Sequence, residues 1–225
     1  MTRAPLLALL LLASAPATPA QTPEPAAPPP AAAAAAPDPW AALTAVRESL
    51  IAAGPTGAEF TQAYVPVGFS TGEEEHGRLA LALPDCLRWD YRDPYPKSFL
   101  LCGAEAFYWN PEDKTGRRYP VDRQQEPGLD LLLLGVEQLR ERYQATAAAG
   151  DDGRVEIDLA PRDGEAAPTG FTSAHLVIDA ASHRLVELSY RDPEGNLSRF
   201  TISGYGPLGA DGLFSPPKGI AWEDG

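Results

Sequence analysis

Apolar and polar positions along the chain predict a helix near residue 40. The apolar side chains there recur at helical spacing: Trp40, Leu43, Val46, Leu50 and Ile51. Asp38 and Pro39 precede them as an N-cap and a first helical residue, and Gly54-Pro55 ends the pattern. We therefore expect a helix between Asp38 and Gly54.

Beyond this helix the apolar positions alternate, as in strands that present large residues on one face and small or polar residues on the other. The alternating residues are Phe60, Gln62 and Tyr64, then Leu79, Leu81 and Leu83, then Leu87, Trp89 and Tyr91. From Gly128 a leucine-rich run interrupts the alternation and favours a helix. We expect further strands at roughly 143–149, 153–160, 173–180, 184–191, 197–204 and 213–222.

Short turns join most of these predicted strands, which favours an antiparallel meander. The segment Asp192-Pro193-Glu194-Gly195-Asn196 is one such hairpin turn. A single sheet with this many strands must curl, and its concave face then needs a cover. The helix near residue 40 and the leucine-rich run are the candidates for that cover. We predict a mainly β fold with helices (α+β), in which helical segments cover a curled sheet.

The first 20 residues have the features of a secretory signal peptide. Arg3 provides the positive region, Leu6 to Leu12 a short apolar region, and Thr18-Pro19-Ala20 a cleavage signal. The apolar run is too short to span a membrane, and no cysteine stands at the cleavage site for lipid attachment. Residues 21–37 are almost entirely Pro and Ala, which favours a semi-extended tether. We expect residues 38–225 to form the folded domain of an exported protein.

The chain is strongly acidic, with a formal net charge of −13. Such a chain is a poor match for nucleic acid and for an anionic membrane surface, because both repel it. We attribute the charge to solubility and expect no nucleic-acid partner.

Cys86 and Cys102 are the only cysteines in the sequence. In an exported protein two cysteines most often pair, and two free buried thiols are the alternative. Residues 92–97 lie midway between them and have the composition of a hairpin loop. In that hairpin, residues whose numbers sum to about 188 face each other, and the two cysteines meet this condition. A cross-strand disulfide is therefore compatible with the predicted register.

Several motifs match patterns of catalytic or nucleotide sites but lack the local structure that those sites need. Residues 204–209 fit the glycine pattern of dinucleotide-binding sites. That pattern requires a helix at this point, and Pro207 and the glycines that follow are incompatible with one. Ser215-Pro216-Pro217-Lys218 fits a serine acyl-enzyme pattern, yet Pro217 would break the required helical turn. The histidines have no partner at metal-ligand or catalytic spacing: His76, His175 and His183. We expect no catalytic residue, no metal and no cofactor, although folding can assemble a site that no local motif shows.

Several short blocks resemble the periplasmic outer-membrane lipoprotein carriers, the LolA family, and follow the order of that family. They are Phe60-Thr61-Gln62-Ala63-Tyr64, then Gly77-Arg78-Leu79 leading to Pro84, Leu87-Arg88-Trp89-Asp90-Tyr91 with Pro96, Gly103 followed by Phe107-Tyr108-Trp109-Asn110-Pro111, Phe200-Thr201-Ile202, and Leu213-Phe214-Ser215-Pro216-Pro217-Lys218-Gly219-Ile220. Together the blocks cover nearly all of residues 39–222. No block is specific alone, whereas the ordered set is fairly specific, above all residues 77–111 and the closing Phe-x-Pro-Pro-x-Gly.

The resemblance implies an unclosed antiparallel β-barrel of about 11 strands covered by an α-helical lid. It also implies a non-enzymatic, monomeric periplasmic carrier that binds the acyl chains of lipoproteins. Such a carrier takes acylated lipoproteins from an inner-membrane ABC transporter and hands them to an outer-membrane acceptor. Two positions depart from the family: Leu83 replaces an arginine that ties the barrel to the lid, and Cys102 replaces a common aspartate.

The resemblance and the alternation together place a ligand cavity on the large residues of the predicted strands. We expect the cavity to be lined by Leu79, Leu81, Leu83, Leu87, Trp89, Tyr91, Phe99 and Leu101. We expect the lid to be formed by Leu129, Leu131, Leu132, Leu133 and Leu134. Ordinary core packing is the alternative for each of these residues, because aromatic and branched residues in strands are usually core.

Three other functions stay open from the sequence. A lipid-binding or envelope-stress sensing protein on the same fold would take a different lipid or lipoprotein ligand, and such sensors normally carry a second domain. A membrane-anchored acceptor would need a lipid-anchor cysteine, and an exported hydrolase would use Ser215 and Lys218. The sequence does not distinguish lipoprotein, glycolipid and free fatty acid as cargo.

Overall fold

The computed structural model describes residues 36–121, 135–162, 171–209 and 212–225. The chain divides into two units, residues 1–34 and 35–225, and every described residue belongs to the second unit. The predicted signal peptide and most of the predicted tether therefore lie outside the described residues. The five leucines predicted to form the lid also lie outside them.

Helix α1 spans Pro39–Ala53, as the apolar spacing predicts. The carboxylate of Asp38 accepts hydrogen bonds from the backbone N–H groups of Trp40 (2.8 Å) and Ala41 (3.2 Å), which caps the first turn. Gly54 ends the helix at a φ of 69°, a conformation that glycine adopts without steric strain. Leu43 and Leu50 are buried on one face of this helix, so the face is packed rather than solvated.

Within the described residues, the regular structure after α1 consists of twelve strands, one further helix and a short 3₁₀ turn. The strands are β1 (Thr56–Val65), β2 (Glu73–Ala82), β3 (Cys86–Asp93), β4 (Lys97–Cys102), β5 (Glu105–Asn110), β6 (Thr115–Pro120), β7 (Tyr143–Ala149), β8 (Arg154–Pro161), β9 (Ser173–Asp179), β10 (Arg184–Arg191), β11 (Leu197–Pro207) and β12 (Ala221–Asp224). Helix α3 spans Val136–Arg142, and the 3₁₀ turn η1 spans Asp151–Gly153.

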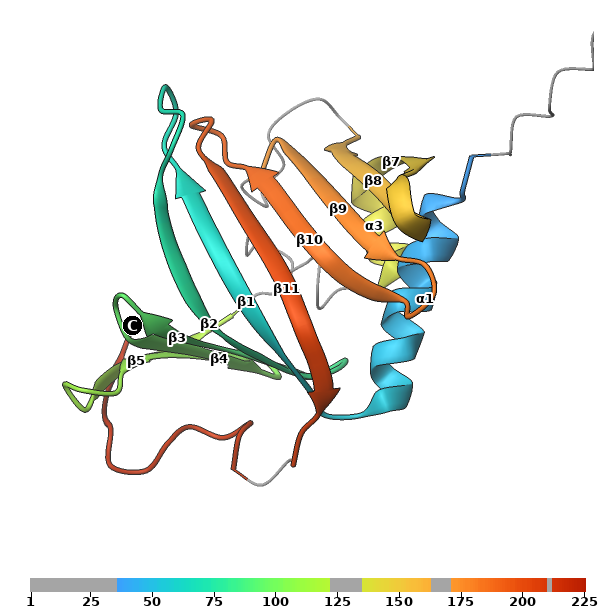
Figure 1. Ribbon diagram of the computed structural model, residues 1–225. Helices are drawn as coiled ribbons and strands as arrows, with labels where there is room; N and C mark the ends of the chain where they lie inside the picture. Colours follow the sequence, from blue (N-terminus) through green and yellow to red (C-terminus); the bar gives the residue numbers. More distant parts are fainter. Residues whose placement is uncertain (1–35, 122–134, 163–170, 210–211) are drawn as a thin grey trace, which may run out of the picture. The chain divides into compact units, whose positions relative to one another are not determined.

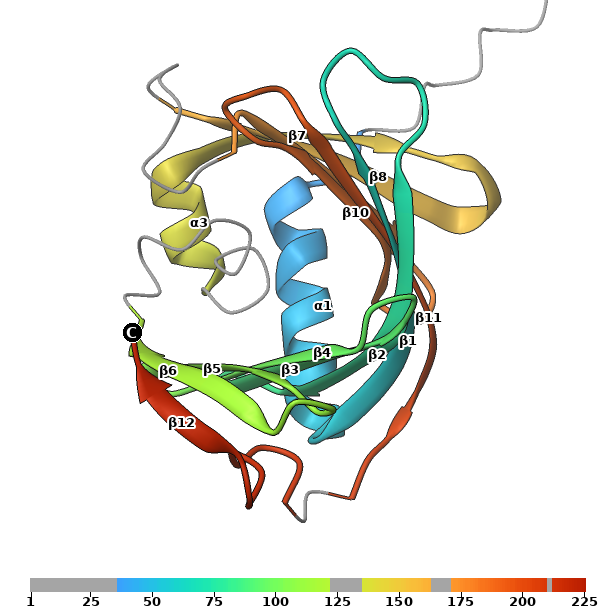
Figure 2. The same cartoon turned by 90° about the vertical axis from the view of Figure 1, so that its left-hand side faces the viewer.

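All twelve strands belong to one sheet, in the order β12-β6-β5-β4-β3-β2-β1-β11-β10-β9-β8-β7. β12 pairs with β6 in parallel, and the other pairings along the sheet are antiparallel. The two edge strands, β7 and β12, lie far apart in this order, so the sheet curls without closing (Figure 1). Figure 2 shows α1 lying inside the curve of the sheet. The predicted fold, an unclosed and mostly antiparallel sheet with helices, is confirmed.

The hairpin of β3 and β4 has the predicted register. Cys86 lies opposite Cys102, Leu87 opposite Leu101, and Trp89 opposite Phe99. The two cysteines form a disulfide with their Cα atoms 4.3 Å apart, which confirms the predicted pairing. The hairpin that supplies much of the predicted cavity wall is therefore covalently tied at one end.

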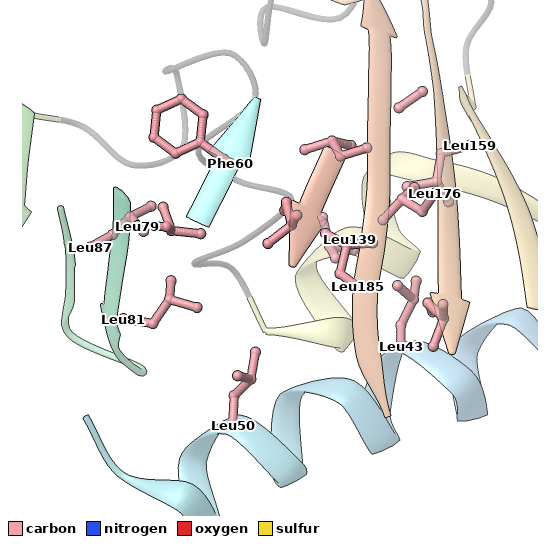
Figure 3. Close-up of a cluster of buried hydrophobic side chains, with 14 of the residues drawn as sticks. Leu43, Leu50, Phe60, Leu79, Leu81, Leu87, Leu139, Leu159, Leu176 and Leu185 are labelled. Atoms are coloured by element: carbon pink, nitrogen blue, oxygen red, sulfur yellow. The ribbon is translucent and has the colours of Figure 1, made fainter. Parts of the chain in front are cut away.

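The larger of two apolar clusters lies between the sheet and the helices (Figure 3). Leu43 and Leu50 of α1 and Leu139 of α3 pack there against the leucines of β2, β8, β9 and β10. The members labelled in Figure 3 are Leu43, Leu50, Phe60, Leu79, Leu81, Leu87, Leu139, Leu159, Leu176 and Leu185. The helices therefore cover part of the concave face.

A smaller apolar cluster lies on the opposite face of β4 and β5. Its fully packed members are Leu100, Phe107 and Trp109, and the C-terminal residues Phe214, Ile220 and Trp222 pack against them. The strand expected at 213–222 is wrong in extent, because residues 212–220 form turns and only β12 is extended. Pro216 and Pro217 lack the backbone N–H that a sheet ladder requires, which explains the difference.

Candidate functional site

An apolar hollow of about 220 Å³ lies on the concave face of the sheet. Its walls come from β1 to β6 on one side and from β10 and β11 on the other. These two groups of strands meet because β1 pairs with β11, for example Phe60 opposite Ile202. The hollow therefore forms where the two halves of the meander join.

Five of the eight predicted cavity residues line this hollow: Leu79, Trp89, Tyr91, Phe99 and Leu101. Leu81 and Leu83 line a smaller hollow of about 50 Å³ beneath α1 and α3. Leu87 has no exposed surface and belongs to the larger apolar cluster. The structure thus gathers seven of the eight residues around two neighbouring hollows, and their role in ligand binding stays a prediction.

Aromatic rings form a continuous wall along the larger hollow. Tyr91 lies edge-on to Phe60, with ring centroids 5.0 Å apart, and edge-on to Phe99 at 6.0 Å. Phe200 continues the row from Phe60 (6.2 Å) to Tyr190 (6.4 Å). Rings in such arrangements bury a large apolar area and hold one another in place. The wall presents an apolar surface with few hydrogen-bonding groups.

One polar patch interrupts this wall. The hydroxyl of Tyr91 donates a hydrogen bond to Oε1 of Gln62 at 2.5 Å. Burial raises the pKa of the Tyr91 hydroxyl above its ordinary value, and the neighbouring Glu75 and Tyr190 raise the pKa further. Lys97 and Glu75 form an ion pair beside the ring of Tyr91, with a shortest N–O distance of 2.7 Å. The patch carries no net charge, because the ammonium of Lys97 is paired with the carboxylate of Glu75.

The smaller hollow shares two wall residues, Leu79 and Ile202, with the larger one. Leu83, which stands where the resemblance expects an arginine, lines this hollow together with side chains of α1. The helical cover is fastened by other groups instead. The guanidinium of Arg184 on β10 donates to Oγ of Ser49 on α1 at 2.6 Å. Arg140 of α3 lies over the ring of Trp40 of α1, 5.4 Å from its centroid.

The wall residues from β1, β10 and β11 are not among the predicted cavity residues. They are Phe60, Gln62, Leu188, Tyr190, Phe200 and Ile202. Their alternation along the strands is visible in the sequence, and the hairpin turn at 192–196 pairs Leu188 with Phe200. The contact that brings them to the cavity is the pairing of β1 with β11, which joins residues about 140 positions apart and has no local signal.

The histidines, Ser215 and Lys218 are not among the residues that line the hollow. Within the described ranges, no three or more His, Cys, Asp or Glu side chains lie close enough to hold a metal ion. His175 contacts Asp158 at 2.8 Å on another part of the sheet. Ser215 and Lys218 lie in turns rather than on a helix, so they are not one helical turn apart. In the described part of the chain, no helix is long and apolar enough to cross a membrane.

Comparison with known proteins gives one family. The family model for "Outer membrane lipoprotein carrier protein LolA" matches residues 55–216, well over half of the chain. An outer-membrane lipoprotein carrier protein of Bordetella pertussis is 26% identical over 186 residues, which cover 80% of this chain and 86% of that protein. One of Dechloromonas aromatica is 25% identical over 166 residues, which cover 72% and 77%.

Among solved structures, an uncharacterized conserved protein from Thermus thermophilus has a TM-score of 0.52 at 13% identity. The similarity covers 82% of this chain and 97% of that protein. At this identity the likeness shows the fold alone.

Proposed function

Because the chain belongs to the LolA family of outer-membrane lipoprotein carrier proteins, we propose that it is a periplasmic carrier that binds the acyl chains of lipoproteins. The observation that carries this proposal is the apolar hollow walled by aromatic rings on the concave face. An acyl chain needs apolar contact along its length rather than specific polar groups, and this wall offers such contact.

The energetics favour a carrier that retains its cargo in water. Transfer of acyl chain from water to an apolar environment yields about 0.8 kcal/mol per CH₂ group. A chain of about 16 carbons would therefore gain roughly 12 kcal/mol in a dry cavity. Widening the hollow exposes apolar protein surface and offsets part of this gain, which permits release to a better acceptor.

The hollow must widen to accept cargo. Its volume of about 220 Å³ lies below the range of about 300–1,000 Å³ that is usual for small-molecule sites. Since Leu79 and Ile202 border both hollows, a displacement of α1 or α3 would join the two spaces. In such a displacement the contacts of Arg184 with Ser49 and of Arg140 with Trp40 would break first, before the packing of the apolar core is disrupted.

We infer the cellular route from the family. Residues 1–20 would direct export and be removed, residues 21–37 would act as a tether, and residues 38–225 would form the carrier domain of a monomer. The carrier would receive lipoproteins from an inner-membrane ABC transporter and pass them to an outer-membrane acceptor. It would act without catalysis.

Filling the hollow tests this proposal. Ala106 is buried on the wall, and Ala106→Phe would occupy the space with a ring. Ala104→Phe is the matched control, because Ala104 lies in the exposed turn between β4 and β5. We expect the Ala106→Phe protein to bind a tripalmitoylated cysteinyl peptide at least tenfold more weakly than the wild type and the control, as measured by fluorescence titration.

The same peptide without acyl chains supplies the second control, and we expect no binding of it. Equal affinity of the Ala106→Phe and Ala104→Phe proteins for the acylated peptide would show that the hollow is not the binding site. Equal binding of the acylated and unacylated peptides would contradict the carrier function itself.

A further inference from the structure

The polar patch joins four side chains from four strands: Gln62 and Tyr91 line the hollow, and the Lys97–Glu75 pair lies next to Tyr91. Gln62 and Glu75 are register partners on β1 and β2, so their side chains stand on the same face. Tyr91 on β3 donates to Gln62, and the ammonium of Lys97 on β4 lies 4.5 Å from the centroid of the Tyr91 ring. The patch therefore crosses the wall next to the rings that would contact an acyl chain.

The charges of this patch already satisfy each other. Nζ of Lys97 lies 2.7 Å and 2.9 Å from the two carboxylate oxygens of Glu75. The side chains of Lys97 and Glu75 are only 27% and 17% exposed, so water screens them poorly. An anionic ligand would have to compete with Glu75 for Lys97, and it would also be repelled by Glu75. The patch thus offers no free cation to a carboxylate.

The patch does offer neutral hydrogen-bond donors. Oε1 of Gln62 accepts the bond from Tyr91, which leaves the two N–H donors of the amide. Among the described residues, none provides a hydrogen-bond acceptor for that amide nitrogen. Gln62 lines the hollow, so its side-chain amide lies within reach of cargo in that space. A carbonyl oxygen is the ligand group that such donors fit.

Resting on the proposed function, we propose that this patch receives the ester or amide carbonyl at the head of an acyl chain, and that the hollow therefore selects acyl esters and amides over free fatty acids. Gln62 supplies the hydrogen bond to the carbonyl. Tyr91 fixes the orientation of the Gln62 amide. The Lys97–Glu75 pair disfavours a free carboxylate, because burying an unpaired charge costs more than burying a neutral group.

The test compares two ligands of equal chain length, N-methyldodecanamide and sodium dodecanoate, by isothermal titration calorimetry at pH 8. We expect the wild type to bind the amide at least tenfold more tightly. Glu75→Gln keeps the shape of the side chain but frees the charge of Lys97. In this variant we expect the preference for the amide to fall at least tenfold, or to reverse.

Glu74→Gln is the matched control, because Glu74 is exposed on the same strand and its loss changes the net charge equally. We expect this control to keep the wild-type preference. Lys97→Gln provides an independent variant: it leaves Glu75 without its partner, so discrimination against dodecanoate should increase. Gln62→Met should weaken amide binding several-fold more than dodecanoate binding, because only the amide loses its hydrogen bond.

The outcomes separate this inference from the carrier function. Binding of both ligands with equal affinity by the wild type, or an unchanged preference in folded Glu75→Gln protein, would overturn the selectivity alone. Absence of binding of either ligand, together with absence of binding of the acylated peptide, would overturn the carrier function.

Discussion

Strands β4 and β5 carry large apolar side chains on both faces, and the two faces meet different surroundings. On one face, Leu100, Phe107 and Trp109 are packed under the C-terminal segment of the same chain. On the other face, Phe99 and Leu101 border a hollow of about 220 Å³. The chain fills one apolar face itself and leaves the other incompletely filled. The filled face thus serves stability, whereas the hollow face is the one that we propose a ligand fills.

The filled face is held by specific contacts of residues 212–225, which Figure 2 shows running outside the curve of the sheet. Arg88 donates to the carbonyl of Leu213 at 3.0 Å and lies over the ring of Trp109. Trp222 lies edge-on to Phe107, with ring centroids 5.3 Å apart, and β12 extends the sheet beside β6. These contacts leave little freedom on that face, in contrast to the concave side.

Trp109→Ala should cause the largest loss of stability. Trp109 is 3% exposed, and truncation of a buried ring costs about 3–5 kcal/mol. Phe99→Ala, on the hollow side of the same hairpin, should cost about 1–2 kcal/mol, because part of that ring already faces empty space. Urea unfolding measures both losses of stability. Equal losses would show that the two faces are packed equally well, contrary to this account.

Loss of the disulfide should come next. The Cys86–Cys102 bridge closes a loop with a sequence separation of 16 residues, and constraint of such a loop in the unfolded chain is worth about 3 kcal/mol. We expect the doubly substituted protein, Cys86→Ser with Cys102→Ser, to unfold at a lower temperature than the oxidised wild type. Reductant should lower the wild-type midpoint to that of the variant and leave the variant unchanged. Two titratable thiols in the native exported protein would contradict the bridge.

Arg88→Met should loosen the C-terminal segment. The guanidinium of Arg88 bonds both Asp90 and the carbonyl of Leu213, and hydrogen bonds of charged groups contribute about 1.5–3 kcal/mol. Hydrogen exchange should increase at β12 and much less at β1. Arg154→Met, at an exposed position on β8 far from β12 in the sheet, is the control and should leave exchange unchanged. Uniform exchange in the Arg88→Met protein would show that this residue does not fasten the segment.

The smallest effect concerns alkaline pH. Burial raises the pKa of Tyr91 and of Tyr205 above the ordinary value. A raised folded-state pKa gives stabilisation that is complete below about pH 10 and is lost as the pH rises further. Each tyrosine should therefore lower the unfolding free energy by about 1.4 kcal/mol per pH unit above that point.

Tyr91→Phe removes the contribution of the Tyr91 hydroxyl to this loss of unfolding free energy. The contribution of Tyr205 remains. We expect the variant to lose about half of the extra slope between pH 10 and 11.5, as measured by urea unfolding. An unchanged slope would show that the Tyr91 hydroxyl ionises as freely in the fold as in the unfolded chain.

The local features of the fold follow from the sequence, and the long-range ones do not. The caps of α1 at Asp38 and Gly54, and the opposition of Trp89 and Phe99, depend on neighbours within one helix or hairpin. The pairing of Phe60 with Ile202, which completes the cavity wall, depends on the closure of a long loop. For that reason the predicted cavity included five wall residues of the hollow and missed those on β1, β10 and β11.

The C-terminal segment shows a second limit. Phe214, Ile220 and Trp222 alternate poorly, and two prolines separate Phe214 from the others. Their packing on Phe107 and Trp109 becomes visible only once the outer face of β5 is placed. The C-terminal segment covers the outer face of β5, a contact between residues about 110 positions apart that no local pattern indicates.

Purification of the mature protein from the periplasm, followed by mass spectrometry of what it carries, tests the central claim most directly. We predict a chain that begins at Gln21 and that carries peptides with an acylated N-terminal cysteine, which the Ala106→Phe protein should lack. A native protein that is empty, or that carries acyl groups equally after Ala106→Phe, would contradict the account.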